Sequence, residues 1–471
     1  MKTLSACKNS CVILLLFAAT AISLQAQTYT RLHSFDIADG YAPDAGLVQA
    51  ADGNLYGTTY QGGANGFGTT FMITPRGTLT TLHTFCSMNL CTDGAYPLGG
   101  LVQATDGNLY GTTTAGGQSY GTVFRITLTG TLTTLHKFAG LPTEGSSPSA
   151  SLVQATDGSF YGTTSGGGTY GYGTVFKITR SGVLTTLHNF CSENLCSDGQ
   201  NPYASLVQFT NGNLYGTTYS GGANGFGTIF MITTKGRLTT LHSFTDEDGA
   251  NPYAGLVQAT DGNFYGTTYG GGAESDGTVF KITPDGILTT LHSFVGGPTD
   301  AANPYAGLIE ATDGNFYGTT DGGGTETYGT VFEITSSGAV TILHSFCSQR
   351  GCADGQGSEA ALVQDTNGTF YGATPEGGAM GYGTVFSLSD GLGEFVETLP
   401  TSGKVASTVG ILGTQLTGAT NVTFNGTAAV FKVISNSLIT ATVPAGATTG
   451  KIQVATPGGT LTSNIPFRVM H

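Results

Sequence analysis

The sequence has no tryptophan, few charged residues and no excess of positive charge. Charged side chains make up 10% of its 471 residues, against about 25% in an average soluble protein. Lys and Arg number 16 against 30 Asp and Glu, which gives a formal net charge of −14. Binding to nucleic acid needs clustered cations that neutralise phosphates. The charge balance therefore excludes nucleic acid as a partner.

Helical periodicity and a regular glycine triplet are also missing. Glycine is abundant at 75 residues, but it does not recur at every third position, which excludes collagen. Hydrophobic residues make up 39% of the chain, which argues against general disorder. β-branched and aromatic residues alternate with polar ones at a period of two, and this pattern predicts an all-β fold.

The N-terminal segment has the organisation of an export signal. Lys2 and Lys8 precede an apolar run over 12–21, and small residues follow it, with cleavage expected after Ala26. The run is too short to span a bilayer, and no later stretch is long enough. We therefore expect that 1–26 is removed, that no transmembrane segment remains, and that the protein is secreted or lies at the cell surface.

Six of the eight cysteines form three C-x4-C motifs, each followed by one residue and then Asp-Gly. Metal sites need further Cys or His nearby, and redox motifs usually read C-x-x-C. We therefore predict three local disulfides formed in an oxidising compartment. The predicted pairs are Cys86/Cys91, Cys191/Cys196 and Cys347/Cys352.

The chain repeats itself seven times at a period of about 50 residues, which predicts a propeller. The repeats are aligned by the tyrosine of a Tyr-Gly-Thr/Ala-Thr motif, at Tyr56, Tyr110, Tyr161, Tyr215, Tyr265, Tyr317 and Tyr371. These tyrosines are expected to pack between blades.

Each repeat predicts four strands, which we call A to D. In the fifth repeat they cover 256–259, 263–268, 277–283 and 287–294. Asp261-Gly262 predicts a type I′ turn between strands A and B, and Pro284-Asp285-Gly286 a second tight turn between strands C and D. These short turns share one face, and the long B–C and D–A connections share the other, where we expect variable chemistry.

The copy number of strand D predicts how the ring closes. One copy, Thr28 to Phe35, precedes the first repeat, and none follows the seventh strand C. We therefore predict a seven-bladed β-propeller over 27–390, closed by this N-terminal strand so that no lateral edge stays unpaired. Composition changes after about Gly393, and short strands with Gly, Pro and Asn turns over 395–470 predict an immunoglobulin-like β-sandwich.

The repeat phrases resemble a known family. Asp-Gly-Asn-Leu/Phe-Tyr-Gly-Thr-Thr, Gly-Thr-Val-Phe-Lys-Ile-Thr and Leu-Thr-Thr-Leu-His-Ser-Phe resemble the GloVer tandem-repeat (choice-of-anchor) family of exported bacterial proteins. The resemblance implies a surface or secreted location and no established activity. The phrasing is also similar, more weakly, to the propeller repeats of two-component regulator sensors. The segment 395–470 resembles an IPT/TIG domain, which implies a spacer or interaction module.

Residues that recur in every repeat are expected to be structural. Seven of the eight histidines occupy one position of strand D, and a catalytic role rarely needs seven copies. The glycine-rich loops precede strands rather than helices, so they do not predict a phosphate site. Clusters such as Asp246 to Gly249 are explained by turn formation, and we predict no metal or cofactor site.

Residues that break the symmetry are the candidates for chemistry. Glu310 replaces the strand A glutamine in the sixth repeat, and Asp276 replaces the aromatic residue before strand C in the fifth. Asp321 replaces the Tyr, Thr or Ser that usually follows strand B. In principle these three could supply an acid–base pair, whereas neutral drift explains them without function.

Tyrosines of the D–A connections are the candidates for binding. Tyr96, Tyr203, Tyr253 and Tyr305 lie there, the last three within Asn-Pro-Tyr. Exposed rings stack on sugars or contact a protein partner, and the alternative is that they pack between blades. We predict a monomeric, non-enzymatic surface protein that binds a polysaccharide or a protein. A glycan-active hydrolase or lyase and a purely structural envelope protein remain as alternatives.

Overall fold

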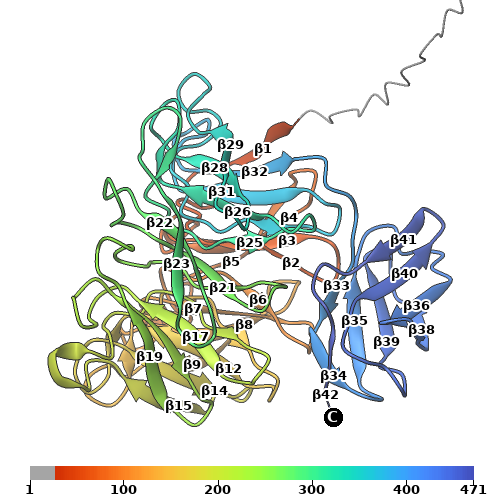
Figure 1. The fold of residues 1–471 in the computed structure, drawn as a ribbon, viewed down its shortest axis with the longest axis horizontal. Coiled ribbons are helices and arrows are strands. Elements are labelled where there is room, and N and C mark those ends of the chain that lie inside the picture. The colour runs from red at the N-terminus through yellow and green to blue at the C-terminus, as the bar shows by residue number, and fades with distance from the viewer. Residues whose placement is uncertain (1–26, 471) are drawn as a thin grey trace, which may run out of the picture.

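The computed structural model describes residues 27–470, so the predicted export signal (1–26) lies outside the described residues. The fold is all-β and propeller-like (Figure 1). Two short 3-10 helices, η1 (Asn89–Cys91) and η2 (Asn194–Cys196), lie in the first two cysteine loops. Each repeat forms one four-stranded antiparallel sheet, which we call repeat sheets 1 to 7.

The strands of the repeat sheets have nearly constant lengths and run from strand A to strand D in each sheet. Sheet 1 contains β2 (Val48–Gln49), β3 (Leu55–Thr59), β4 (Thr69–Ile73) and β5 (Leu79–Thr84). Sheet 2 contains β6 (Val102–Gln103), β7 (Leu109–Thr113), β8 (Thr122–Ile126) and β9 (Leu132–Lys137). Sheet 3 contains β11 (Val153–Gln154), β12 (Phe160–Thr164), β14 (Thr174–Ile178) and β15 (Leu184–Asn189). Sheet 4 contains β16 (Val207–Gln208), β17 (Leu214–Thr218), β18 (Thr228–Ile232) and β19 (Leu238–Ser243).

The remaining repeat sheets follow the same order. Sheet 5 contains β20 (Val257–Gln258), β21 (Phe264–Thr268), β22 (Thr278–Ile282) and β23 (Leu288–Ser293). Sheet 6 contains β25 (Ile309–Glu310), β26 (Phe316–Thr320), β28 (Thr330–Ile334) and β29 (Val340–Ser345). Sheet 7 contains β30 (Val363–Gln364), β31 (Phe370–Thr374), β32 (Thr384–Ser389) and β1 (Thr28–Ser34). Two loop ladders pair β10 (Gly145–Ser146) with β13 (Gly166–Gly167), and β24 (Ala301–Ala302) with β27 (Gly322–Gly323).

The turn between strands A and B differs from its predicted type. Gly262 has φ +84°, but Asp261 does not have a positive φ. The N–H of Gly262 donates to the carbonyl of Ala259, and that of Ala259 to the carbonyl of Asn263. This is a three-residue loop that ends in a left-handed glycine. The prediction of a type I′ turn is therefore wrong, because Asp261 instead uses its carboxylate to accept from Asn263 N.

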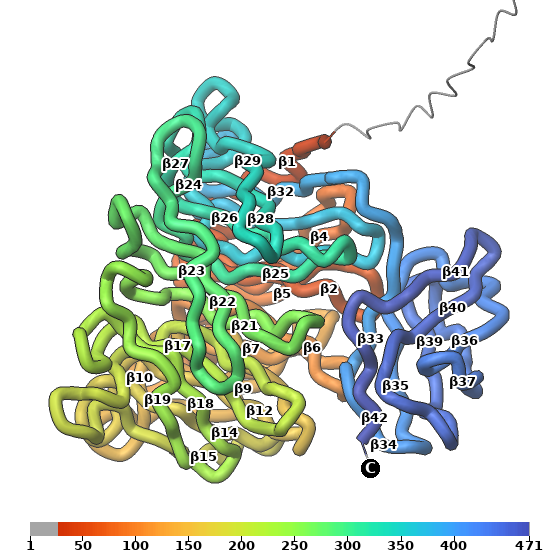
Figure 2. Tube along the Cα trace, viewed as in Figure 1, coloured from red at the N-terminus to blue at the C-terminus, as the bar shows by residue number. Residues whose placement is uncertain are grey.

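The first strand of the chain completes the last repeat sheet. β1 pairs antiparallel with β32, with Thr28 opposite Ser389 and Ser34 opposite Thr384. Figure 2 shows β1, in red, beside β32, in blue. A Cβ on Gly77, in the C–D turn of sheet 1, would lie 2.7 Å from the carbonyl oxygen of Leu32 in β1. The predicted pairing of the N-terminal strand is confirmed.

Apolar side chains pack between successive sheets rather than inside one sheet. One cluster joins Tyr56 and Phe85 of sheet 1 to Leu109 and Phe124 of sheet 2. Six further clusters join the other neighbours, and one of them joins sheet 7 to sheet 1 through Tyr371 and residues of sheet 1. The predicted packing of the repeat tyrosines between sheets is confirmed, and the sheets form a closed series.

The C-terminal residues form a separate module around their own apolar core. One sheet contains β33 (Glu397–Leu399), β35 (Thr408–Leu412), β39 (Leu438–Thr442) and β38 (Phe431–Val433). A second contains β37 (Thr427–Ala428), β36 (Asn421–Phe424), β40 (Ile452–Thr456) and β41 (Gly459–Thr462). A parallel pair, β34 (Ser402–Lys404) and β42 (Arg468–Met470), accompanies them. Alternate residues of both sheets, such as Ile411 and Val454, fill the core.

This module covers the short-turn face of the repeat sheets (Figure 1, right). Ser437 Oγ donates to Ala51 O at 2.9 Å, Asn464 Nδ2 to Glu310 O at 2.9 Å, and Phe395 N to Thr366 O at 3.0 Å. A cavity of about 260 Å³ lies between the module and the strand A residues of sheets 5, 6, 7 and 1. The long-loop face stays uncovered by the module, and the candidate site lies there.

Candidate functional site

Three disulfide-closed loops stand on the long-loop face. The structure contains all three predicted pairs, Cys86–Cys91, Cys191–Cys196 and Cys347–Cys352. Each loop folds over the aspartate that follows it, and Asp93, Asp198 and Asp354 are completely buried. Asp93 accepts hydrogen bonds from Ser87 N at 3.0 Å and Ser87 Oγ at 2.7 Å. The loops are thus tied to the sheets by side-chain bonds as well as by sulfur.

Each strand D histidine bonds to a carboxylate of the connection that follows it. Nε2 lies 2.7 to 3.1 Å from the nearest carboxylate oxygen. The pairs are His33–Asp39, His83–Asp93, His136–Glu144, His188–Asp198, His242–Asp248, His292–Asp300 and His344–Asp354. The predicted structural role of the histidines is confirmed. The carboxylate partners were missed, although an acidic residue follows each histidine within ten positions.

A ring of seven equivalent residues surrounds the centre of the long-loop face. These residues occupy one position of the D–A connection, just before it enters strand A, and six of them follow a proline. We call them the mouth residues. They are Asp44, Leu98, Ser149, Tyr203, Tyr253, Tyr305 and Glu359. Three successive members are aromatic, and two other neighbours, Glu359 and Asp44, are acidic.

The three mouth tyrosines form a continuous stack. The ring centroids of Tyr203 and Tyr253 are 4.8 Å apart, and those of Tyr253 and Tyr305 are 4.0 Å apart. Two tyrosines that follow strand B, Tyr219 and Tyr269, pack edge-on against the stack. All five side chains are half-buried. We call them the tyrosine cluster.

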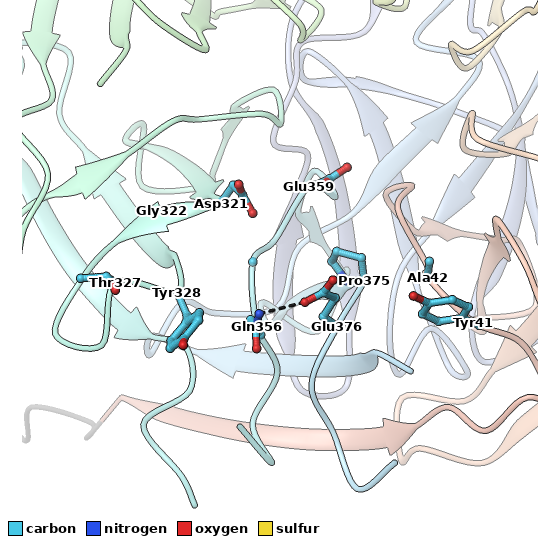
Figure 3. A pocket seen from close by; sticks show the side chains of 11 residues that line it. Tyr41, Ala42, Asp321, Gly322, Thr327, Tyr328, Gln356, Glu359, Pro375 and Glu376 are labelled. Atoms are coloured by element: carbon cyan, nitrogen blue, oxygen red, sulfur yellow. Dashed lines mark hydrogen bonds between the residues drawn. The ribbon is translucent and has the colours of Figure 1, made fainter. Parts of the chain in front are cut away.

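A cavity of about 510 Å³ opens beside this cluster, between sheets 6, 7 and 1. Asp321, Glu359 and Glu376 line it, and Tyr41 and Tyr328 stand on opposite sides of it (Figure 3). Gln356 Nε2 donates to Glu376 Oε2 at 2.8 Å, as the dashed line in Figure 3 marks. Its lining contains three carboxyl groups and no Lys, Arg or His. We call it the acidic cavity.

Glu359, Asp321 and the nearby Asp44 hold their protons more tightly than usual. Burial, together with the charges of Asp321 and Glu376, raises the pKa of Glu359 to about 7. Burial and then the charge of Glu359 raise the pKa of Asp44 well above its ordinary value. Desolvation and the charge of Glu376 raise the pKa of Asp321. At neutral pH Glu359 is therefore protonated in part, and its carboxyl group both donates and accepts hydrogen bonds.

The structure brings together only some of the residues predicted as candidates. Tyr203, Tyr253, Tyr305 and Asp321 lie around the centre of the long-loop face. Tyr96 stands apart, because it precedes Pro97 instead of following it, and its ring packs against Tyr60 and Phe67.

The proposed carboxylate trio is not assembled. Glu310 lies opposite Phe316 at one end of β26, whereas Asp321 follows the other end, about 15 Å away at the rise of a strand. Both Glu310 oxygens accept from Thr260 on the short-turn side. Asp276 lies at the outer side of sheet 5, where Asn303 N donates to its carbonyl. These positions do not form an acid–base pair with Asp321.

Several residues of the site were missed by sequence reasoning. Asp44, Glu359 and Glu376 were not proposed, and neither were Tyr219 and Tyr269. An alignment of the connections on their prolines places Asp44 in register with Tyr203, and Glu359 takes the same place where Ser358 replaces proline. Within residues 27–470, no group of three or more His, Cys, Asp or Glu is arranged to hold a metal ion. No helix in that part of the chain is long and apolar enough to cross a membrane.

Comparison with known sequences identifies the repeats. The sequence profile of the Gloeobacter/Verrucomicrobia repeat matches three overlapping segments, 18–156, 119–312 and 297–433. A search of the curated proteins found no relative.

Solved structures share the fold at low sequence identity. Virginiamycin B lyase from Staphylococcus aureus has a TM-score of 0.51 and 16% identity, over 77% of this chain and 99% of its own. The extracellular domain of a hybrid two-component system from B. thetaiotaomicron has a TM-score of 0.54 and 11% identity, over 92% and 52%. A fungal alcohol oxidase in complex with copper has a TM-score of 0.53 and 13% identity, over 94% and 99%. At these identities the likeness shows a propeller-like fold and carries no activity to this chain.

Proposed function

Since this chain belongs to the Gloeobacter/Verrucomicrobia repeat family, we propose that it is an exported, non-enzymatic binding protein that recognises a polysaccharide at its long-loop face. In this proposal the seven repeat sheets are the blades of a propeller over 27–390. The module at 395–470 is an immunoglobulin-like domain of the IPT/TIG type that covers the opposite face. Three disulfides support an oxidising compartment such as the cell exterior.

The tyrosine cluster beside the acidic cavity is the observation that carries this proposal. Tyrosine rings offer apolar faces and a hydroxyl, and they lose little conformational entropy when a ligand binds. The cavity next to them supplies carboxyl, amide and hydroxyl groups, which suit the many hydroxyls of a sugar. Sugars present the same combination of apolar ring faces and polar edges. A concave, mixed surface of this kind fits a glycan better than a flat protein partner.

An array of neutral, acidic and amino-sugar polysaccharides tests the proposal with the purified protein. We expect binding to at least one polysaccharide, and a loss of about tenfold or more in affinity for Tyr253→Ala, the central ring of the stack. The matched control is Ile287→Ala, an exposed residue in the short-turn face of sheet 5, which should bind like the unaltered protein. Absence of binding across the array would instead favour a structural role.

Catalysis is the second candidate, and the acidic cavity is the observation that favours it. A carboxyl that keeps its proton near pH 7, beside carboxylates, is the pairing that acid–base cleavage of a glycosidic bond uses. Glu359 would be the proton donor, with Asp321 or Glu376 as the second carboxyl group of the pair. Product release from the bound polysaccharide, measured in parallel with binding, separates the two functions. Release that Glu359→Gln abolishes while binding persists would establish an enzyme.

A further inference from the structure

A second group of aromatic residues lies at the outer rim of the long-loop face, over sheets 2 and 3. Tyr120, Tyr170 and Tyr172 are 44%, 51% and 41% exposed, and Leu141 is 60% exposed. Large apolar side chains are usually buried, so a group of four exposed ones marks an interaction surface. We call these four residues the rim patch. None of them carries a charge.

The rim patch is one continuous surface. A Cβ on Gly140 would lie 2.9 Å from the ring of Tyr120, so that ring rests on the Gly140 backbone. Leu141 follows directly, and its Cδ2 would lie 3.9 Å from a Cβ on Gly171, between Tyr170 and Tyr172. The connection after sheet 2 thus places Leu141 next to the loop of sheet 3.

The rim patch also adjoins the tyrosine cluster. Asn201 N donates to Tyr172 O at 2.9 Å, and Asn201 is two residues before Tyr203. Gly173 approaches Pro202 so closely that a Cβ would lie 2.8 Å from its Cδ. Tyr172 precedes the third strand of sheet 3, and Tyr203 precedes an inner strand. The strand that follows Tyr203 is the first strand of sheet 4, so the two tyrosines belong to neighbouring sheets.

The other repeats do not offer the same outward path. The residue equivalent to Tyr172 is a half-buried phenylalanine in sheets 1 and 4, namely Phe67 and Phe226. It is Asp276 in sheet 5. In sheet 6 it is Tyr328, which is 43% exposed but lines the acidic cavity, and in sheet 7 it is the half-buried Tyr382, whose ring packs against Tyr41. Exposed rings therefore lead from the tyrosine cluster to the rim over sheets 2 and 3.

We propose that the rim patch is a distal subsite for the same glycan chain, so that the ligand is a polymer of several sugar units and not a mono- or disaccharide. This inference rests on the proposed function, because it extends the site at the tyrosine cluster. One sugar ring cannot cover both the cluster and the rim, whereas a chain can contact both at once. Once one segment of the glycan is bound, contacts of a second segment form within the same complex. The high effective concentration of that second segment then raises the affinity of the whole chain.

A length series of oligosaccharides tests this inference. The probes are oligosaccharides of about two and about eight units, prepared from the polysaccharide that binds most strongly on the array, and the measurement is calorimetry. We expect the longer probe to bind about tenfold more tightly or better. Tyr170→Ala with Tyr172→Ala should remove that gain and leave affinity for the shorter probe unchanged. Val183→Ala, an exposed residue on the short-turn side of sheet 3, is the control.

The outcomes separate the two proposals. Equal affinity at both lengths, or a length gain that survives the double variant, overturns the rim subsite and leaves binding at the tyrosine cluster intact. Loss of binding at both lengths in Tyr253→Ala supports the tyrosine cluster as the primary site. Absence of binding by every array polysaccharide overturns both proposals. Circular dichroism of the double variant excludes loss of fold as the cause.

Discussion

Nε2 of His83 lies 3.1 Å from Oδ2 of Asp93, and this buried pair links the outer strand of one sheet to the connection that leads to the next. Equivalent pairs occur at His188–Asp198 and His344–Asp354. Although burial opposes it, the hydrogen bonds from Ser87 and His83 hold the pKa of Asp93 below its ordinary value. The pair therefore stabilises the fold while Asp93 is ionised.

Replacement of Asp93 by alanine should destabilise the protein by about 2–3 kcal/mol, because it leaves buried donors of Ser87 and His83 without an acceptor. The measurement is the urea midpoint of unfolding. Asp285→Ala, in an exposed C–D turn, is the control and should change stability by less than about 0.5 kcal/mol. An Asp93 variant that unfolds like the unaltered protein would contradict the structural role of the pair.

The depressed pKa of Asp93 and of Asp198 predicts loss of stability in acid. Burial raises the pKa of Asp198, but the hydrogen bonds from His188 and Ser192 lower it by more, so that it lies below its ordinary value. A carboxyl with a folded pKa below its unfolded value of about 3.9 stabilises the fold above that value. We expect the melting temperature to fall as pH drops below about 4. The fall should be smaller in the Asp93→Asn/Asp198→Asn variant, which starts from a lower melting temperature.

Glu359 predicts a pH effect of the opposite sign. Its folded pKa of about 7 lies above its unfolded value of about 4.3, so ionisation destabilises the folded state. Glu359→Gln should raise stability at pH 8 by about 1–3 kcal/mol and change it little at pH 4. Thermal melts at both pH values measure this. Equal stabilisation at both pH values would show that the effect does not come from ionisation of this carboxyl.

Each disulfide should contribute modestly, because it closes a short ring. The Cys191→Ser/Cys196→Ser variant is expected to lose about 2 kcal/mol and to keep the fold. The chain-entropy effect of a loop of this length sets that value. Urea unfolding with and without reductant measures this loss of stability. Reductant should lower the stability of the variant by less than that of the unaltered protein, because the variant has one disulfide fewer. Complete unfolding on loss of this one pair would contradict the prediction.

Removal of residues 27–36 should prevent stable folding, because β32 loses its partner and sheet 7 is left with an open edge. In this deletion variant, a copy of the Thr28–Phe35 segment inserted after Gly391 should restore folding, since it allows a C–D hairpin like those of the other repeats. Size-exclusion chromatography and melting curves compare the two chains. A deletion variant that melts like the intact protein would contradict closure by β1.

The repeat architecture could be predicted because each repeat states the same pattern independently. Strands, face assignment, pairing of β1 and the structural role of the histidines all follow from positions that recur. The turn at Asp261 was misassigned, because Asp-Gly fits both a type I′ turn and the longer loop that ends in Gly262. The backbone of the structure distinguishes them, because Asp261 lacks a positive φ and Gly262 N donates to Ala259 O.

The candidate site was less predictable, because it depends on which residues meet around the ring. Tyr96 and Tyr203 both stand in D–A connections, but their different positions about the proline send their rings to different neighbours. Glu310 and Asp321 both break the symmetry, yet a five-residue strand separates them. The direction of the strand alone therefore places Glu310 and Asp321 at opposite ends of it. That Asp44 lies near Glu359 follows only from the closed series of sheets, which brings sheet 1 next to sheet 7.

The pairing of β1 with β32 also sets the order of events during folding. The strand that emerges first finds its partner only after residue 389 has emerged, while the other six sheets need only local neighbours. Chain fragments that stop earlier therefore expose two unpaired sheet edges. Contacts between residues so far apart in sequence form slowly. A truncated molecule is thereby distinguishable from a complete one by any protease or chaperone that acts on open sheet edges.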